Sequence, residues 1–403
     1  MLSFKNELDQ IPSHIQGVDR ISSVSSILDN NENYGKEARS KIHDFLEYMV
    51  KIEASDLDMG GVGTNGKIWY RISGNKKPAS IFPEIDLDEA TAIIVSILTQ
   101  RQIDKIMFNQ NTDFSYKMLL NGKYQRFRAD AYMDMDFLAI NFRRINSTPF
   151  DINSYGFSKQ ILNKFNLAYE KRGLILVTGI TGSGKSTTLD SIIDMNNEQN
   201  YAHIIIIGNP IEYFHKSKKS IVRHREVGKD TLSFKQGAIE ALRQDPDIIV
   251  VGEMRDPETI ITVLETTDSG HKVFSTLHTS SAAESVHRII AECPPEEQNR
   301  VRNRLADVLK IVISQKLVPG LNGKLVLAKE VLHVTPYVSA AIVNNNIGEI
   351  YQMITEGKDY GMITLEQDLF RLFLRKKISM ENAIAYSNNK KRLLELIEYY
   401  RNR

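Results

Sequence analysis

The feature that most constrains the fold is an apolar stretch that runs into a glycine-rich turn, "LILVTGITGSGKSTTLD", at residues 174–190. Gly-x4-Gly-Lys-Ser between a strand and the start of a helix is the pattern of a phosphate-binding loop. Its glycines let successive backbone N–H groups point at phosphate oxygens. The alternative, an ordinary glycine-rich turn, explains the complete pattern less well, so this stretch predicts nucleotide binding.

Individual residues of the loop have expected roles. Lys185 is expected to reach the β- and γ-phosphates of ATP, and the Ser186 hydroxyl is expected to ligate Mg²⁺. The other loop residues expected to bind the nucleotide are Gly179, Thr181, Gly182, Ser183 and Gly184.

From about residue 158, apolar strands alternate with amphipathic helices, which is typical of a parallel α/β sheet. The strand candidates are "LILVTG", "HIIIIG", "DIIVVGE" and "HKVFSTLH". Such sheets bind ligands at the carboxyl ends of their strands. Glu253 ends one of these strands, where it is placed to polarise a water beside the γ-phosphate. His278 ends another and is suited to sense that phosphate, although a lone histidine is more often structural.

The residues before the sheet predict a smaller domain. Residues 1–35 are polar and rich in Ser, Asn and Asp, so a loosely ordered extension with one short helix is expected. Residues 36–145 are expected to form an α+β domain. It begins with the helix "KEARSKIHDFLEYMVKI", whose apolar face is Ile42, Phe45, Leu46 and Met49, and it has a second helix near "LDEATAIIVSILTQRQIDKIM".

Three further segments complete the predicted organisation. Residues 146–158 contain Pro, Asn, Ser and Gly and are expected to be a hinge. Residues 159–330 are expected to form the ATPase core, and residues 331–403 a mostly helical C-terminal region.

Composition excludes several classes of protein. Lys and Arg (51) nearly balance Asp and Glu (50), which argues against a nucleic-acid binder. The single Cys293 excludes a disulfide framework and a multi-cysteine zinc site, and it suits a reducing compartment. No apolar run approaches the roughly 18 residues of a membrane-spanning helix. The N-terminus has no apolar signal core, so the cytoplasm is the expected location.

Three motifs together resemble the type II/IV secretion ATPase family, and by pattern its pilus-retraction branch. They are "GITGSGKSTT", "LRQDPDIIVVGEMRDPETI" and "SGHKVFSTLHTSSAAESVHRI". The similarity extends over about residues 36–387, with "ASDLDMG", "REVGKDTLSF" and "GMITLEQDL" as further matches. Other branches usually carry a tetracysteine zinc module, which one cysteine cannot build.

The resemblance implies a PAS-like N-terminal domain joined to a RecA-like ATPase domain, in a ring of six identical subunits. It implies that ATP, with Mg²⁺, lies between the two domains and that hydrolysis moves one against the other. The implied partner is an inner-membrane pilus platform protein or a secretion-system base. The chain is therefore expected to be cytoplasmic and peripherally associated with the inner membrane.

The resemblance also implies roles for residues. Thr187 matches the phosphate loop, Glu253 the catalytic glutamate, and His271 and His278 the family's histidine motif.

Arg128 and Arg143 match N-domain arginines that reach a nucleotide in the ring. An arginine supplied from another domain or subunit stabilises transition-state charge. The alternative is that they are surface arginines of a strand, since Arg126 and Arg144 are adjacent competitors.

The chain departs from the family in "HIIIIGNPIEYFH", residues 203–215. The family has an acidic box, Glu-Asp-Pro-Ile-Glu, that helps to hold Mg²⁺ and its water, whereas this chain has Gly208 and Asn209 at the first two positions. Glu212 is retained and is a nucleotide-site candidate, and Asn209 still offers a carbonyl oxygen. Because Mg²⁺ requires strict octahedral oxygen geometry, the hypothesis is that ATP binding is intact and hydrolysis is slowed.

A second departure is "AAIVNNNIGEI" (340–350), which lacks the arginines of the family's helix there. Three functions are therefore weighed. The first is an ATPase motor that powers type IV pilus retraction and twitching motility. The second is a weakly hydrolytic ring subunit or a Dot/Icm-like secretion motor. The third, a nucleic-acid motor, is disfavoured because the sequence has no aromatic-basic strand-binding stretch.

Overall fold

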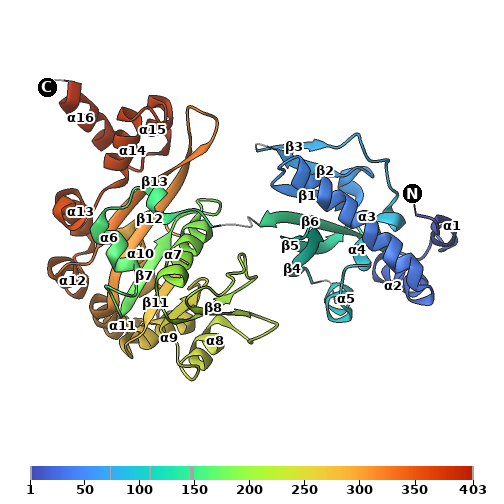
Figure 1. Cartoon of the computed structure of the whole chain (residues 1–403), viewed down its shortest axis with the longest axis horizontal. Helices are drawn as coiled ribbons and strands as arrows, with labels where there is room; N and C mark the ends of the chain where they lie inside the picture. The colour runs from blue at the N-terminus through green and yellow to red at the C-terminus, as the bar shows by residue number, and fades with distance from the viewer. Residues whose placement is uncertain (1, 73, 109, 146–148, 402–403) are drawn as a thin grey trace. The chain divides into compact units, whose positions relative to one another are not determined.

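The computed structural model describes residues 2–72, 74–108, 110–145 and 149–401. The chain divides into two units, residues 1–147 and 148–403, each with its own sheet (Figure 1). This division falls within the 146–158 segment that the sequence analysis assigns to the hinge.

The first unit contains a six-stranded antiparallel sheet with strand order β3-β2-β1-β6-β5-β4. The strands are β1 (Asp56–Gly60), β2 (Trp69–Ile72), β3 (Asn75–Pro78), β4 (Thr112–Leu120), β5 (Lys123–Asp134) and β6 (Phe137–Ile145). The helices are α1 (Lys5–Leu8), α2 (Gly17–Asn30), α3 (Glu32–Lys51), α4 (Leu87–Val95) and α5 (Gln100–Met107). Side chains alternate between the two faces of each strand, and Phe127, Ala129 and Ala131 of β5 are buried in the core of this unit.

Helix α3 confirms the predicted apolar face. The Asn31 side chain accepts a hydrogen bond from the backbone N–H of Asn33 and so caps the helix. Its buried residues include the four that the sequence predicts, Ile42, Phe45, Leu46 and Met49.

The expectation of a loosely ordered extension over residues 1–35 is wrong. Helix α2 lies there, and Ile21, Val24 and Leu28 are buried at a helical spacing. Leu2 and Phe4 of the preceding segment are also buried in the core of the first unit. Three apolar residues on one face are enough to pack that face against the core, although the overall composition of the helix is polar.

The helix predicted near residues 87–107 is two helices. Asp86 and Glu89 form a capping box at the start of α4, and Thr99 and Gln102 form one at the start of α5. Each box satisfies backbone N–H groups at a helix start. The second box therefore begins a new helix within a stretch whose apolar pattern is continuous.

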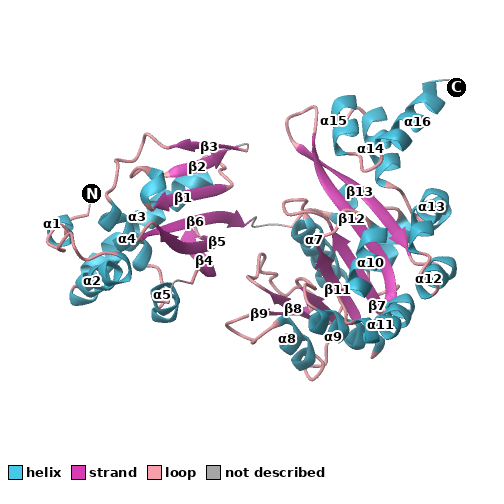
Figure 2. Ribbon diagram, turned by 180° about the vertical axis from the view of Figure 1, so that it is seen from behind, coloured by secondary structure: helices cyan, strands magenta, loops and turns pink. Residues whose placement is uncertain are grey.

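The second unit contains a seven-stranded sheet with strand order β13-β12-β7-β11-β10-β8-β9 (Figure 2). All neighbours are parallel except β12 and β13, which are antiparallel. The strands are β7 (Gly173–Thr178), β8 (His203–Gly208), β9 (Ile221–Glu226), β10 (Ile248–Val251), β11 (Lys272–Leu277), β12 (Leu309–Pro319) and β13 (Leu325–His333). The four predicted strands are confirmed as β7, β8, β10 and β11, whereas β9, β12 and β13 were not predicted.

Helices surround this sheet. Those before β12 are α6 (Lys159–Phe165), α7 (Lys185–Gln199), α8 (Phe234–Ala241), α9 (Pro257–Asp268), α10 (Ala282–Ala291) and α11 (Pro295–Val308). The C-terminal ones are α12 (Pro336–Val343), α13 (Ile350–Glu356), α14 (Leu365–Leu374), α15 (Met380–Tyr386) and α16 (Lys390–Arg401). None of the helices in the described part of the chain has the length and apolar character that crossing a bilayer requires.

The sheet is buried on both faces, which explains its uninterrupted apolar strands. In β8, Ile205 and Ile207 belong to one hydrophobic core, and Ile204 and Ile206 belong to the other. A strand that buries both of its faces needs apolar residues at every position. The predicted α/β class is therefore confirmed in this unit, and the run of four isoleucines has a structural cause.

The burial of α2 predicts a stability effect. Ile21 is 2% exposed, and we expect Ile21→Ala to lower the free energy of unfolding of the first unit by about 2–5 kcal/mol, because it leaves a cavity. Urea unfolding followed by Trp69 fluorescence measures this, since Trp69 is the only tryptophan and lies on β2 of that unit. The control is Ser26→Ala on the exposed face of α2, expected within about 0.5 kcal/mol of wild type. Equal effects of the two substitutions would contradict the packing of α2.

Candidate functional site

The loop between β7 and α7 has the backbone that its glycines predict. Gly179, Gly182 and Gly184 have φ values of +148°, +80° and +85°, which side-chain-bearing residues rarely adopt. A Cβ on Gly179 would lie 2.4 Å from Ser183 Oγ and 2.5 Å from the carbonyl oxygen of Gln315. Only glycine fits there, because the loop curls tightly against β12.

Lys185 is the first residue of α7 and its side chain turns back into the loop. Its Nζ donates to the carbonyl oxygens of Gly179 (2.9 Å) and Ile180 (3.2 Å). Burial lowers the pKa of Lys185, and the charges of Glu212 and Glu253 oppose this shift. The loop carbonyls thus hold the ammonium of Lys185. The two carboxylates favour its charged form.

The hydroxyl of Ser183 is a second sign of a ligand site. Ser183 is 2% exposed, and its Oγ forms no hydrogen bond with any residue that the structure describes. An unpaired buried polar atom costs free energy unless a ligand or water satisfies it. The loop therefore presents a buried hydroxyl, a lysine and the positive end of a helix dipole, which together fit a polyphosphate.

Gln315 of β12 holds the phosphate loop by hydrogen bonds, and no sequence motif predicted this role. Its Nε2 donates to the carbonyl oxygen of Ser183 at 2.9 Å, and its Oε1 accepts from Thr188 Oγ1 at 3.0 Å. Gln315 follows Ser314, which pairs with Thr178 at the end of β7. No motif marks Gln315, because its role depends on β12 lying beside β7.

The remaining loop candidates lie where a nucleotide would meet them. Thr181 is exposed at the turn, whereas Ser186 and Thr187 are half-buried in the first turn of α7. The Ser186 hydroxyl and the carboxylates of Glu212 and Glu253 are hard oxygen donors of the kind that suits Mg²⁺. The residues present thus fit a Mg²⁺–nucleotide complex.

Glu253 and His278 meet at the carboxyl edge of the sheet, as predicted. Thr276 Oγ1 donates to the carbonyl oxygen of Gly252 at 2.6 Å, which joins the ends of β10 and β11. His278 Nε2 lies 3.7 Å from Glu253 Oε2, and Arg255 Nε lies 2.7 Å from the same oxygen. Burial, with a smaller effect of the nearby Lys185, lowers the pKa of His278, and Glu253 opposes that shift.

The altered acidic box lies at the same edge. The backbone N–H of Gly252, one residue before Glu253, donates to the carbonyl oxygen of Ile207 at 2.8 Å. Gly208 is therefore beside the strand end that carries Glu253. A Cβ on Gly208 would approach Ile211 Cδ1 at 2.8 Å, which is the end of a flexible side chain. Glu212 is exposed, in the loop that follows.

The structure places His271 away from this edge, and its expected role in nucleotide binding stays a prediction. His271 precedes β11 and lies near Thr266 and Ser269, with Nδ1 distances of 3.3 Å and 3.0 Å to their oxygens. A strand of six residues spans about 20 Å. The two histidines of the motif are thus at opposite ends of the strand.

Arg128 and Arg143 belong to the first unit, where they face each other in register on β5 and β6. Each is paired with a carboxylate. Arg128 Nη2 lies 2.5 Å from Asp113 Oδ2, and Arg143 Nε lies 2.9 Å from Asp56 Oδ1. Carboxylates on both sides allow two like charges to stand opposite each other. Of their competitors, Arg126 donates to Ser115 Oγ at 2.8 Å.

Comparison with known proteins identifies relatives along most of the chain. The family described as "Type II/IV secretion system protein" matches residues 36–358. The type IV pilus retraction ATPase PilT of Pseudomonas aeruginosa is 38% identical over 342 residues, which cover 85% of this chain and 96% of that protein. A twitching motility protein of Neisseria gonorrhoeae is 38% identical over 79% of this chain and 84% of its own length.

Two solved structures resemble the fold. A crystal structure of the pilus retraction motor PilT with bound ADP has a TM-score of 0.78 at 36% identity, over 87% of this chain and 98% of that one. The ATPase DotB of Legionella pneumophila has a TM-score of 0.72 at 25% identity, over 86% and 95% of the two chains. Sequence and fold agree with the phosphate loop and its converging strands, and the chain belongs to the type II/IV secretion system protein family.

Proposed function

We propose that this chain is an ATP-hydrolysing motor that powers type IV pilus retraction. The observation that carries the proposal is the convergence of Lys185, Glu253 and His278 at one edge of the sheet. It occurs in a chain that covers 96% of a relative named as a pilus retraction ATPase. In this proposal residues 159–330 form the ATPase core, and residues 331–403 are the C-terminal helical region.

The residues at this edge of the sheet have separate proposed roles in phosphate binding and proton transfer. Lys185 and the N-terminus of α7 bind the β- and γ-phosphates, and Glu253 accepts a proton from the attacking water. His278, held neutral by its lowered pKa, donates or accepts a hydrogen bond beside Glu253. Arg255 Nε lies 2.7 Å from Oε2 of Glu253, which leaves the other carboxylate oxygen to accept the proton of the water. Mg²⁺, which Ser186 and the nearby carboxylates would hold, neutralises phosphate charge when bound.

The proposed assembly is a homohexamer in the cytoplasm, peripherally attached to the inner membrane through a pilus platform protein or a secretion-system base. Arg128 and Arg143 are proposed to reach a nucleotide within the ring. Their support is that both arginines are already oriented by carboxylates on neighbouring strands. A guanidinium that is fixed before the reaction stabilises transition-state charge with little reorganisation.

A second candidate is a ring subunit that hydrolyses ATP weakly, or a motor of a Dot/Icm-like secretion system. Gly208 and Asn209 favour weak hydrolysis, because the end of β8 carries no carboxylate beside Glu253. The likeness to the DotB structure favours the secretion alternative, although at a lower identity than the likeness to PilT.

Two substitutions separate binding from chemistry. We expect Lys185→Ala to weaken ATP binding at least about tenfold, because a charge-assisted contact to phosphate is lost. We expect Glu253→Gln to keep ATP affinity within about twofold and to lower kcat by about 10²–10⁴. Fluorescent-nucleotide titration and steady-state ATPase measure the two effects. Normal ATP binding by Lys185→Ala would refute the nucleotide site.

Restoring the acidic box tests the slowed-hydrolysis hypothesis. We expect Gly208→Glu/Asn209→Asp to raise kcat by about tenfold, because it returns two carboxylates to the metal side of the site. Gly208→Gln is the size-matched control and carries no charge. A Cβ at position 208 would lie 2.8 Å from Ile211 Cδ1 and 3.3 Å from the carbonyl oxygen of Pro210, so both variants require the same small adjustment there. Equal turnover in wild type, control and double variant would show that the missing acids do not limit the reaction.

The arginines are tested in the assembled ring. We expect Arg128→Gln or Arg143→Gln to lower kcat by about 10³, the range of a catalytic arginine, with the native mass unchanged. Arg126→Gln, on the same strand as Arg128, is the control. A loss of activity no larger than that of Arg126→Gln would assign both arginines to the surface.

A further inference from the structure

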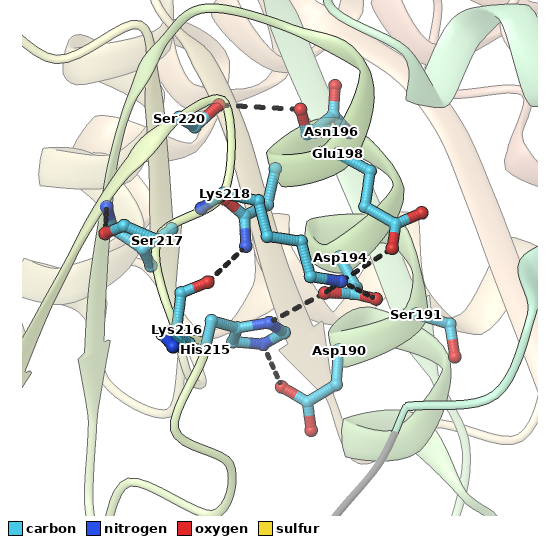
Figure 3. Close-up of polar contacts among 12 residues, drawn as sticks. Asp190, Ser191, Asp194, Asn196, Glu198, His215, Lys216, Ser217, Lys218 and Ser220 are labelled. Carbon is cyan, nitrogen blue, oxygen red and sulfur yellow. Dashed lines mark hydrogen bonds and ion pairs between the residues drawn. The ribbon is translucent and has the colours of Figure 1, made fainter.

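Hydrogen bonds and ion pairs hold the loop after β8, residues 209–220, against the side of α7 (Figure 3). Its start carries Glu212, the one acid that the altered acidic box retains. Just before it, Ile211 is 5% exposed in the core, and its backbone N–H donates to Glu226 Oε2 at 3.3 Å. The segment that presents Glu212 is therefore anchored on its N-terminal side.

The far part of the loop is held by other contacts to α7. Lys218 Nζ lies 2.8 Å from Asp194 Oδ1 and 2.6 Å from Glu198 Oε1. Asn197 donates to the carbonyl oxygen of Lys216 and accepts from the backbone N–H of Lys218, each at 2.9 Å. These contacts lie four or more residues beyond Glu212. They therefore hold the segment that leads into β9, and they do not hold Glu212 itself.

His215, three residues beyond Glu212, also contacts α7. Its side chain is fully buried between two aspartates that are one helical turn apart on α7. Nε2 lies 3.0 Å from Asp190 Oδ1, and Nδ1 lies 3.9 Å from Asp194 Oδ1 (Figure 3). The imidazole thus bridges this loop to the helix that begins with Lys185.

We propose that His215 is a positioning residue for ATP turnover: bridged to Asp190 and Asp194, it fixes Glu212 at the phosphate end of α7. The proposal rests on the proposed ATPase function. Glu212 is three residues before His215, in the loop that follows β8, and the end of β8 lies beside the strand end that carries Glu253. With Ile211 and His215 both buried, the three residues between them have little freedom to move the carboxylate.

The bridge has a definite charge requirement. A neutral imidazole has one N–H and can donate to only one carboxylate, whereas a protonated one can donate to both. Burial alone would lower the pKa of His215, but its hydrogen bond to Asp190 and the charges of Asp190 and Asp194 raise it above the ordinary value. The protonated imidazole, hydrogen-bonded to Asp190 and ion-paired with Asp194, is therefore lost as pH rises through the raised pKa.

Other groups also face the ring of His215. From its own loop this is Tyr213, and from β9 it is His224. Lys218 shares Asp194 with the imidazole. His224 Nε2 accepts from the backbone N–H of His215 at 3.0 Å, which is a further contact that holds this segment.

The test compares His215→Gln with Lys218→Ala, which removes the other charged contact of the loop, and with His203→Gln at the start of β8. Steady-state ATPase is measured against Mg²⁺ concentration, and nucleotide affinity without Mg²⁺ is measured by fluorescent-nucleotide titration. For His215→Gln we expect a loss of about tenfold or more in kcat or in apparent Mg²⁺ affinity. Metal-free affinity should stay within about twofold. Both controls are expected within about twofold of wild type throughout.

Two further measurements exclude a general loss of structure. Hydrogen exchange of residues 209–216 should be faster in His215→Gln, with α7 unchanged. Wild-type kcat should begin to fall at a lower pH than that of His215→Gln, in which only other groups, such as Lys185, titrate on the alkaline side. Unchanged Mg²⁺ dependence and exchange in His215→Gln, or the same alkaline fall in the variant, would overturn the inference. An inactive wild type would instead refute the proposed function, and hydrogen exchange alone would then decide whether the bridge holds the loop.

Discussion

The parallel order of β12, β7, β11, β10 and β8 is the constraint on which the site depends. The carboxyl ends of parallel strands lie at the same edge of a sheet, so the residues that follow these strands lie close together. The phosphate loop follows β7, Glu253 follows β10 and His278 follows β11. Lys185 of that loop is 68 positions from Glu253 and 93 from His278, and only the pairing of their strands makes these residues neighbours.

The charges of this edge are partly satisfied by the protein itself. Lys185 donates to loop carbonyls, and Glu253 is paired with Arg255. A nucleotide must therefore exchange these contacts for its own, which couples binding to small movements of the loop and of Arg255. The absence of carboxylates at Gly208 and Asn209 places more of the remaining negative charge on Glu212 and Glu253. Their positions accordingly matter more in this chain than in one with a complete acidic box.

Helix α7 connects these features. Its first turn carries Lys185 and Ser186, and its half-buried Asp190 and Asp194 hold the loop after β8. The same helix therefore contacts the phosphate loop at its start and the loop after β8 along its side. In this way the strand end that lost its acids remains mechanically tied to the phosphate-binding residues.

Local patterns in the sequence were sufficient to predict the phosphate loop, four strands of the second sheet, helix α3 and the meeting of Glu253 with His278. Glycine spacing, apolar runs and helical periodicity are properties of neighbouring residues, so one segment can be interpreted alone. The sequence could not reveal that α2 is buried, because polar composition masks Ile21, Val24 and Leu28. It also could not reveal Gln315, the bridge at His215, or that His271 and His278 stand at opposite ends of β11. These features depend on contacts between distant segments, and only the tertiary structure decides which strand lies beside which and at which end of a strand a residue stands.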